Sequence, residues 1–105
     1  MSDSRSGPQL PDEAAPHQAL ARLRAQIEQI DELLVKLVAR RMQLARDTGV
    51  IKRAAALPAV DAGREQAVLQ RVGELALAEG VSDADVRRLF ALVIEMARAA
   101  QTESD

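Results

Sequence analysis

The sequence contains no cysteine, tryptophan or tyrosine, and its 105 residues include one phenylalanine and one histidine. The lack of cysteine excludes disulfides, thiolate metal sites and cysteine nucleophiles. His17 follows a stretch rich in proline, serine and acidic residues, so we interpret it as a solvated tail residue and expect no metal site. Because Phe90 is the only aromatic residue, the core must be aliphatic, which favours closely packed helices over a sheet.

Charge and hydropathy exclude several classes of partner. The 14 basic and 16 acidic residues leave a net charge of -2, so there is no overall electrostatic case for binding nucleic acid or an anionic membrane. No apolar run approaches the roughly 20 residues that span a bilayer. The segment 1–16 has no apolar core of a signal peptide, so we expect a cytoplasmic protein.

At 48% hydrophobic, the chain fits one small domain. We expect a disordered N-terminal tail over 1–17, a helical domain over 18–101 and a frayed C-terminus over 102–105. From about His17 to Ala55 there is neither a proline nor a turn cluster, and a heptad stripe indicates one long helix. The stripe consists of Leu20, Leu23, Ile27, Ile30, Leu34, Leu37, Arg41, Leu44, Thr48 and Ile51.

Two shorter helices follow a connector that contains Pro58. The first is expected from about Ala62 to Glu79, with Asp61 as N-cap and Gly80 as the C-terminal stop. The second is expected to begin at Ser82, in a sequence similar to a capping box, and to end near Gln101. Their apolar faces comprise Val68, Leu69, Val72, Leu75 and Ala76, and then Val86, Leu89, Phe90, Val93, Ile94 and Ala97.

The long helix, at about 35 residues, would span roughly 50 Å, more than the diameter of such a small domain. Two short helices cannot cover its stripe in a compact monomer. We therefore predict an all-α fold with three helices per chain, one long and two short, that forms an intertwined six-helix homodimer.

Arg41 interrupts the stripe at a position where every preceding member is leucine or isoleucine. It either extends to the edge of the bundle, pairs with an internal carboxylate or binds a ligand, because an unpaired buried guanidinium is very costly. Arg41, Ala45, Thr48 and Lys52 share one helical face, with the two cations about 16 Å apart and small side chains between them. This arrangement suits a small ligand that carries a carboxylate.

Four other residues have a second interpretation. Gln101 continues the face of Phe90 and Ile94 and could present an amide at the edge of the core, or it could be a solvated helix end. Asp61, Arg64 and Glu65 are ordinary cap and surface charges by default. None of these residues identifies a function alone.

The sequence resembles the all-helical chorismate mutase family over about residues 20–101. The residues that carry the resemblance are 23–27, Ile30-Asp31, 37–41, 49–52, Pro58, Asp61, Arg64-Glu65, 88–90, Ile94-Glu95 and Gln101. The resemblance implies two equivalent sites per homodimer, each completed by an arginine from the other chain, and Arg24 is that residue. Arg24 lies 17 residues before Arg41, about 25 Å along one helix, so both could hardly hold one small molecule within a single chain.

The resemblance also implies a role for each site residue. Arg24 of the partner and Arg41 would bind the two carboxylates of chorismate, and Lys52 and Gln101 would donate to its ether oxygen. Glu65 and the backbone near Asp61 would hold the ring hydroxyl. Arg64 would line the entrance, while Thr48 and Ala45 would form part of the wall. Ala97 stands where the family pattern has serine, which removes one hydroxyl contact to a carboxylate.

The implied reaction is the Claisen rearrangement of chorismate to prephenate in aromatic amino-acid biosynthesis, which needs no nucleophile, proton shuttle, metal or cofactor. Two alternatives stay open. An isochorismate-pyruvate lyase would share the fold and the cations, although Asp61 together with Glu65 favours the mutase. A helical dimerisation module would explain the stripe but not Arg41, Lys52 and Gln101.

Overall fold

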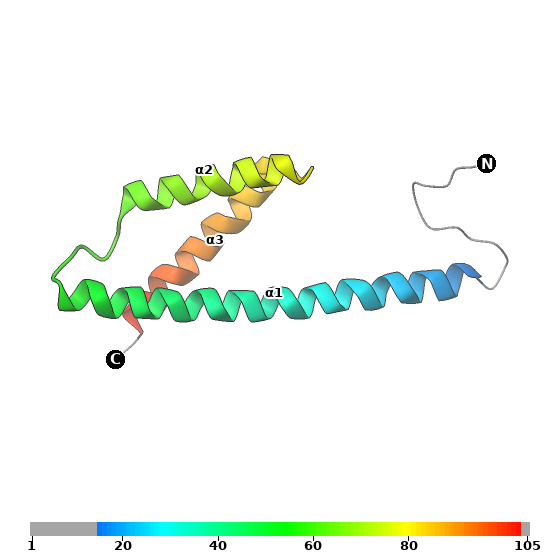
Figure 1. The fold of residues 1–105 in the computed structure, drawn as a ribbon, viewed down its shortest axis with the longest axis horizontal. Helices are drawn as coiled ribbons and strands as arrows, with labels where there is room; N and C mark the ends of the chain where they lie inside the picture. The colour runs from blue at the N-terminus through cyan, green and yellow to red at the C-terminus, as the bar shows by residue number, and fades with distance from the viewer. Residues whose placement is uncertain (1–14, 104–105) are drawn as a thin grey trace. The chain divides into compact units, whose positions relative to one another are not determined.

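The computed structural model describes residues 15–103, which contain three α-helices and no strand. The helices are α1 (Ala15–Ala54), α2 (Ala62–Ala78) and α3 (Asp83–Thr102), shown in Figure 1. The all-α prediction of one long and two short helices is confirmed. None of the helices within residues 15–103 has the length and hydropathy needed to cross a membrane.

The helix α1 begins two residues earlier than the sequence predicted, at Ala15. Pro16 then lies in the first turn, where its missing N–H would have no partner within the helix in any case. The segment 15–17, assigned to the tail, is therefore helical, while 1–14 lies outside the described residues. At the other end, Thr102 belongs to α3 and Glu103 is its C-cap, whereas 104–105 lie outside the described residues.

Two predicted N-caps are present, and they set where α2 and α3 begin. The carboxylate of Asp61 accepts a hydrogen bond from the backbone N–H of Arg64 (3.0 Å). The hydroxyl of Ser82 accepts one from the N–H of Asp85 (3.1 Å), and the side chain of Asp85 pairs with Arg88. The capping box is thus half formed, because its acidic member binds an arginine one turn later.

Helices α1 and α2 end in the same way but with different residues. In each case the third residue past the helix end donates its N–H back to a carbonyl five residues earlier: Leu57 to Lys52 and Val81 to Ala76, both 2.8 Å. This pattern needs a left-handed residue in between. Gly80 fills that position after α2 with φ 74°, and Ala56 fills it after α1 with φ 56°.

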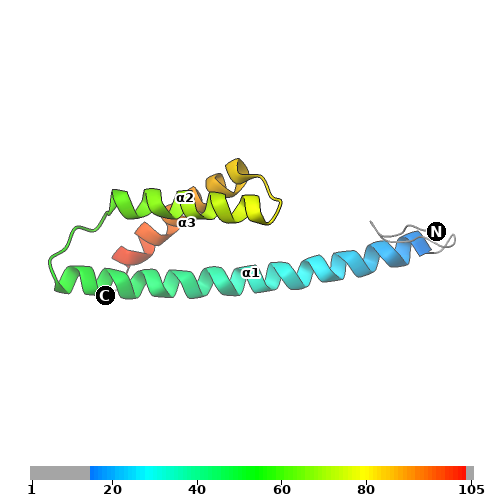
Figure 2. The same ribbon diagram turned by 45° about the horizontal axis from the view of Figure 1, so that its top comes forward.

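The chain divides into two compact units, 15–38 and 39–103 within the described residues, and α1 runs through both. In the second unit, α2 and α3 are packed antiparallel, and the end of α3 lies beside the last turns of α1 (Figures 1 and 2). The buried side chains of this unit are small or aliphatic: Met42, Ala45, Val72, Ala76, Val93, Ile94 and Ala100. The aliphatic core expected from the composition is confirmed, although Leu75 and Leu89 of the predicted apolar faces are exposed.

Candidate active site

A cavity of about 400 Å³ lies within the second unit, between the end of α1 and the helices α2 and α3. Its size lies within the range of small-molecule sites. All its lining residues fall between positions 41 and 101: Arg41, Leu44, Ala45, Thr48, Lys52, Ala59, Asp61, Arg64, Glu65, Val68, Ile94, Ala97, Arg98 and Gln101. They include every residue predicted for the site except Arg24, which is an exposed residue of α1 in the first unit.

The α1 wall of the cavity is the face predicted from the spacing of Arg41, Ala45, Thr48 and Lys52. Arg41 and Lys52 are partly buried and Ala45 is buried. The hydroxyl of Thr48 donates to the carbonyl of Leu44 (2.9 Å), so it can offer only lone pairs to a ligand. This wall therefore presents two cations separated by a largely apolar surface.

Lys52 is held by the connector between α1 and α2. Its Nζ donates a hydrogen bond to the carbonyl oxygen of Ala59 (2.9 Å). An ammonium group has three N–H donors, so two remain for a ligand. The connector thereby limits the positions of a flexible side chain without neutralising its charge, because the acceptor is a backbone carbonyl.

The first turn of α2 brings Arg64 and Glu65 to the cavity. The N–H of Glu65 donates to the carbonyl of Asp61 (3.0 Å), while the Asp61 carboxylate caps Arg64. Because the Asp61 carboxylate already accepts this bond, its N-cap role explains its presence at the cavity without a ligand.

Glu65 forms an ion pair with Arg98 of α3, a residue that the sequence analysis did not select. The Nε of Arg98 donates to one carboxylate oxygen of Glu65 (2.9 Å), and the terminal NH2 group donates to the other. This hydrogen bond lowers the pKa of Glu65 below its usual range; desolvation opposes the effect, and the charges of Arg98 and Lys52 add to it. The same contact raises the pKa of Arg98. One signal was available in the sequence: Arg98 lies four residues after Ile94 and three before Gln101, and so shares their face.

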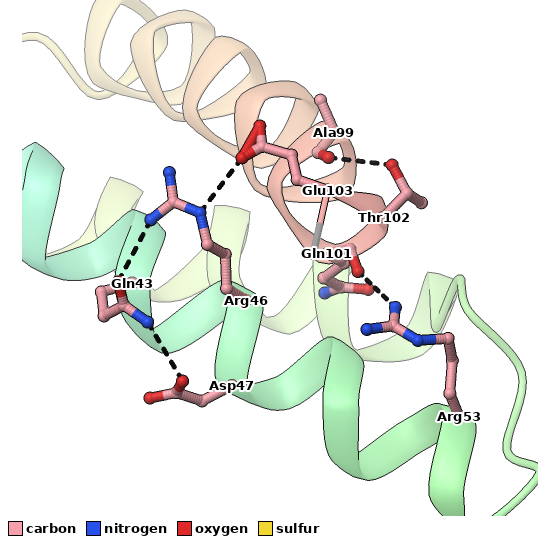
Figure 3. A network of polar contacts seen from close by, with 8 residues as sticks. All are labelled: Gln43, Arg46, Asp47, Arg53, Ala99, Gln101, Thr102 and Glu103. Carbon is pink, nitrogen blue, oxygen red and sulfur yellow. Dashed lines mark hydrogen bonds and ion pairs between the residues drawn. The ribbon is translucent and has the colours of Figure 1, made fainter. Parts of the chain in front are cut away.

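Gln101 is brought to the cavity by a close approach of α3 to α1. A Cβ atom on Gly49 would lie 2.9 Å from the Cα of Gln101, so only glycine fits at this crossing. Arg53 donates to the carbonyl oxygen of Gln101 (2.6 Å), and Arg46 pairs with Glu103, two residues later in the chain (3.1 Å), as Figure 3 shows. The bond from Arg53 therefore fixes the end of α3 to α1 at the residue that lines the cavity.

The charges around the cavity are unbalanced. Four cationic side chains line it, against the two carboxylates of Asp61 and Glu65, which leaves an excess of two positive charges. Such a site suits a small dianion. Ala97 also lines the cavity and brings no hydrogen-bonding group. Within residues 15–103, no group of three histidine, cysteine, aspartate or glutamate residues is placed to hold a metal ion.

Similar sequences among known proteins identify the family of this chain. The family model described as chorismate mutase type II matches residues 23–102, so the chain belongs to the chorismate mutase type II family. The chorismate mutase of Methanocaldococcus jannaschii is 32% identical over 84 residues, which cover 80% of this chain and 85% of that protein. Family membership supports an isomerase with chorismate mutase activity and favours neither alternative.

Two further relatives share the fold or part of the sequence. The bifunctional chorismate mutase/prephenate dehydratase of Escherichia coli K12 is 37% identical over 76 residues, which cover 72% of this chain but 20% of that protein. A solved structure of a conserved hypothetical protein from Pyrococcus furiosus matches with a TM-score of 0.65 and 31% identity, over 79% of this chain and 95% of that one.

Proposed function

We propose that this protein rearranges chorismate to prephenate in the cavity between α1, α2 and α3, as a step of aromatic amino-acid biosynthesis. The observation that carries the proposal is the convergence of Arg41, Lys52 and Gln101 on one cavity with an excess of positive charge. Chorismate carries two carboxylates, and membership of the chorismate mutase family supplies the reaction. The cytoplasmic location stays a prediction, which cell fractionation would test.

The reaction breaks a C–O bond while a C–C bond forms within one molecule. The protein must therefore hold the reactive conformer and stabilise the negative charge that develops on the ether oxygen. In this proposal Arg41 binds one carboxylate. Lys52 donates one N–H to Ala59 and uses a remaining N–H to donate to the ether oxygen. The side-chain amide of Gln101 is the second donor.

The remaining lining residues have smaller roles in the proposal. Glu65 accepts a hydrogen bond from the ring hydroxyl, and the backbone near Asp61 also holds this group. Arg64 lines the entrance, and Thr48, Ala45 and Ala97 form part of the wall. Ala97 has no hydroxyl to donate to a carboxylate, whereas Lys52 also lies near one.

We further propose that the active form is a homodimer in which Arg24 of each chain completes the site of the other. The stripe side chains Leu20, Leu23, Ile27, Ile30, Leu34 and Leu37 are all exposed in the single chain. A partner helix that runs antiparallel would cover them, and a two-fold axis near position 32 or 33 would bring Arg24 close to the partner chain's Arg41.

The test is an assay with purified protein and chorismate, in which chorismate absorbance is lost and prephenate appears without added metal. Lys52→Gln should lower the rate about 10²-fold or more, because it removes a charge worth a few kcal/mol at the ether oxygen. The helical circular dichroism should be unchanged.

Lys36→Gln is the matched control, since Lys36 is an exposed residue of α1 that pairs with Glu32 and does not line the cavity. It should leave the rate unchanged. The proposal fails if the wild-type protein does not turn over chorismate, or if it instead releases pyruvate from isochorismate.

A further inference from the structure

Arg98 and Glu65 form the one ion pair between α2 and α3 found among residues 15–103, and both residues line the cavity. They lie 33 positions apart in sequence and meet through two hydrogen bonds. Paired contacts of this kind fix the plane of the carboxylate as well as its distance from the guanidinium. Neither α2 nor the cap at Asp61 alone would impose that orientation on Glu65.

A carboxylate has about four lone-pair positions, and Arg98 occupies two of them. The other positions stay available to a donor in the cavity. We propose that Arg98 is a positioning residue that holds the Glu65 carboxylate, ionised and in a fixed orientation, as the hydrogen-bond acceptor for the ring hydroxyl of the substrate. This inference rests on the proposed function and adds a residue to it.

The surroundings of Glu65 support an ionised carboxylate. The charged residues that line the same cavity come from all three helices and the α2 cap: Arg41 and Lys52 from α1, Asp61 and Arg64 from the start of α2, and Arg98 from α3. Arg98 is the cation that contacts Glu65, and its hydrogen bond is the main cause of the lowered pKa. The side chain of Glu65 is 20% exposed, so a ligand can still reach it.

The simpler role for this pair is a clamp between two helices. A second pair between helices, Arg46 with Glu103, joins α1 to the end of α3, and neither of its residues lines the cavity. Arg46→Gln is therefore a matched control: it removes an arginine–glutamate pair of the same type at a place where no ligand is expected.

The experiment compares Arg98→Gln, Arg98→Lys, Glu65→Gln and the double variant Arg98→Gln/Glu65→Gln in steady-state assays with chorismate. The ring hydroxyl lies on the carbon next to the breaking C–O bond, but its own bonds do not change in the reaction, so we expect its acceptor to contribute about equally to substrate and transition-state binding. We expect Arg98→Gln to raise KM about tenfold with little change in kcat, as for the loss of one charge-assisted hydrogen bond. Arg98→Lys should restore part of the loss.

Two readouts separate positioning from clamping. In the Glu65→Gln background, Arg98→Gln should have no further effect on KM, because the two residues act as one unit. The acid-side rise of KM should begin at higher pH in Arg98→Gln than in the wild type, because a carboxyl without its cation protonates sooner. An NMR titration of the Glu65 carboxyl should show the same upward change in its pKa.

Three results would overturn the inference. If Arg98→Gln behaves like Arg46→Gln, with lower thermal stability but unchanged KM, the pair is only a clamp. If Arg98→Gln raises KM equally in the Glu65→Gln background, Arg98 acts on the substrate directly. If the wild type does not turn over chorismate, the proposed function fails and the inference fails with it, whereas the first two results leave that function intact.

Discussion

In residues 15–38 of α1, the stripe side chains Ile27 and Ile30 are 56% and 58% exposed, whereas in residues 39–54 Met42 and Ala45 are each 8% exposed. The covered face of the second region is not the stripe. Met42, Ala45 and Gly49 lie one position after the stripe residues Arg41, Leu44 and Thr48, and Leu44 stays 48% exposed. The helix α1 thus has one face that packs against its own chain and a longer apolar face that its own chain leaves exposed.

The residue types on the two faces differ in a way that fits these environments. The face that meets α3 has Gly49, which allows two backbones to approach closely, and Ala45 is buried one turn earlier. The stripe has large aliphatic side chains, and the burial of each one contributes about 1.5–3 kcal/mol of favourable free energy. A second chain is the occupant that we propose for the stripe, and the predictions below test the two faces separately.

The largest effect is expected on the stripe. Ile30→Glu should convert the proposed dimer to monomer at micromolar concentration, because each chain loses about 2 kcal/mol of apolar burial. Two chains then lose about 4 kcal/mol, which weakens dimerisation roughly 10³-fold, and the charge adds to this loss. Sedimentation equilibrium measures the change, and activity should fall with it because Arg24 no longer reaches the other site.

Gln29→Glu introduces the same charge at the neighbouring exposed position, outside the stripe. It should stay dimeric and active. A dimeric and fully active Ile30→Glu protein would show that the stripe is not the interface.

The periodicity of the sequence was sufficient to predict the three helices and the face that carries Arg41 and Lys52, because a 3.6-residue repeat fixes which side chains share a side. It could not predict what covers each face. Leu75 and Leu89 satisfy an apolar pattern and are exposed, since a pattern marks a surface that can be buried but not the partner that buries it.

A residue that lines the cavity was predictable where it broke the pattern and not where it looked ordinary. Arg41 interrupts an aliphatic stripe and is therefore conspicuous. Arg98 shares a face with Ile94 and Gln101, but it lies near the end of a helix, where a charged residue is usually solvated, and its contact with Glu65 depends on how α2 packs against α3. The bond from Lys52 to Ala59 depends on the path of the connector, which no local repeat encodes.

The next largest effect is expected on the covered face. Gly49→Ala would bring a Cβ into the backbone of Gln101, so α3 must move away from α1. Overpacking of this kind costs about 1–3 kcal/mol, and better helix propensity offsets about 1 kcal/mol. We expect a net loss of up to about 2 kcal/mol in urea denaturation at fixed protein concentration, together with lower activity from the displaced Gln101.

Gly63→Ala is the matched control, because the nearest atom to its new Cβ is an Asp61 carboxylate oxygen at 3.6 Å, an ordinary contact. It should be neutral or slightly stabilising. Equal stability of the Gly49 and Gly63 variants would mean that α1 and α3 do not approach as closely as the structure shows.

The smallest effect is expected at the C-terminal end of α1, which has the same backbone hydrogen-bond pattern as the end of α2. Ala56 adopts φ 56°, a left-handed conformation that costs an L-residue about 1–2 kcal/mol, while Gly80 adopts φ 74° at the equivalent place without that cost. Ala56→Gly should therefore stabilise the protein by up to about 1 kcal/mol, part of the gain being offset by the greater freedom of glycine in the unfolded chain. Because Leu57 still donates to Lys52, the rate with chorismate should not change. Thermal melts of both variants measure these changes, and Gly80→Ala should lose stability by a similar amount. A destabilised Ala56→Gly protein would contradict the left-handed conformation at the end of α1.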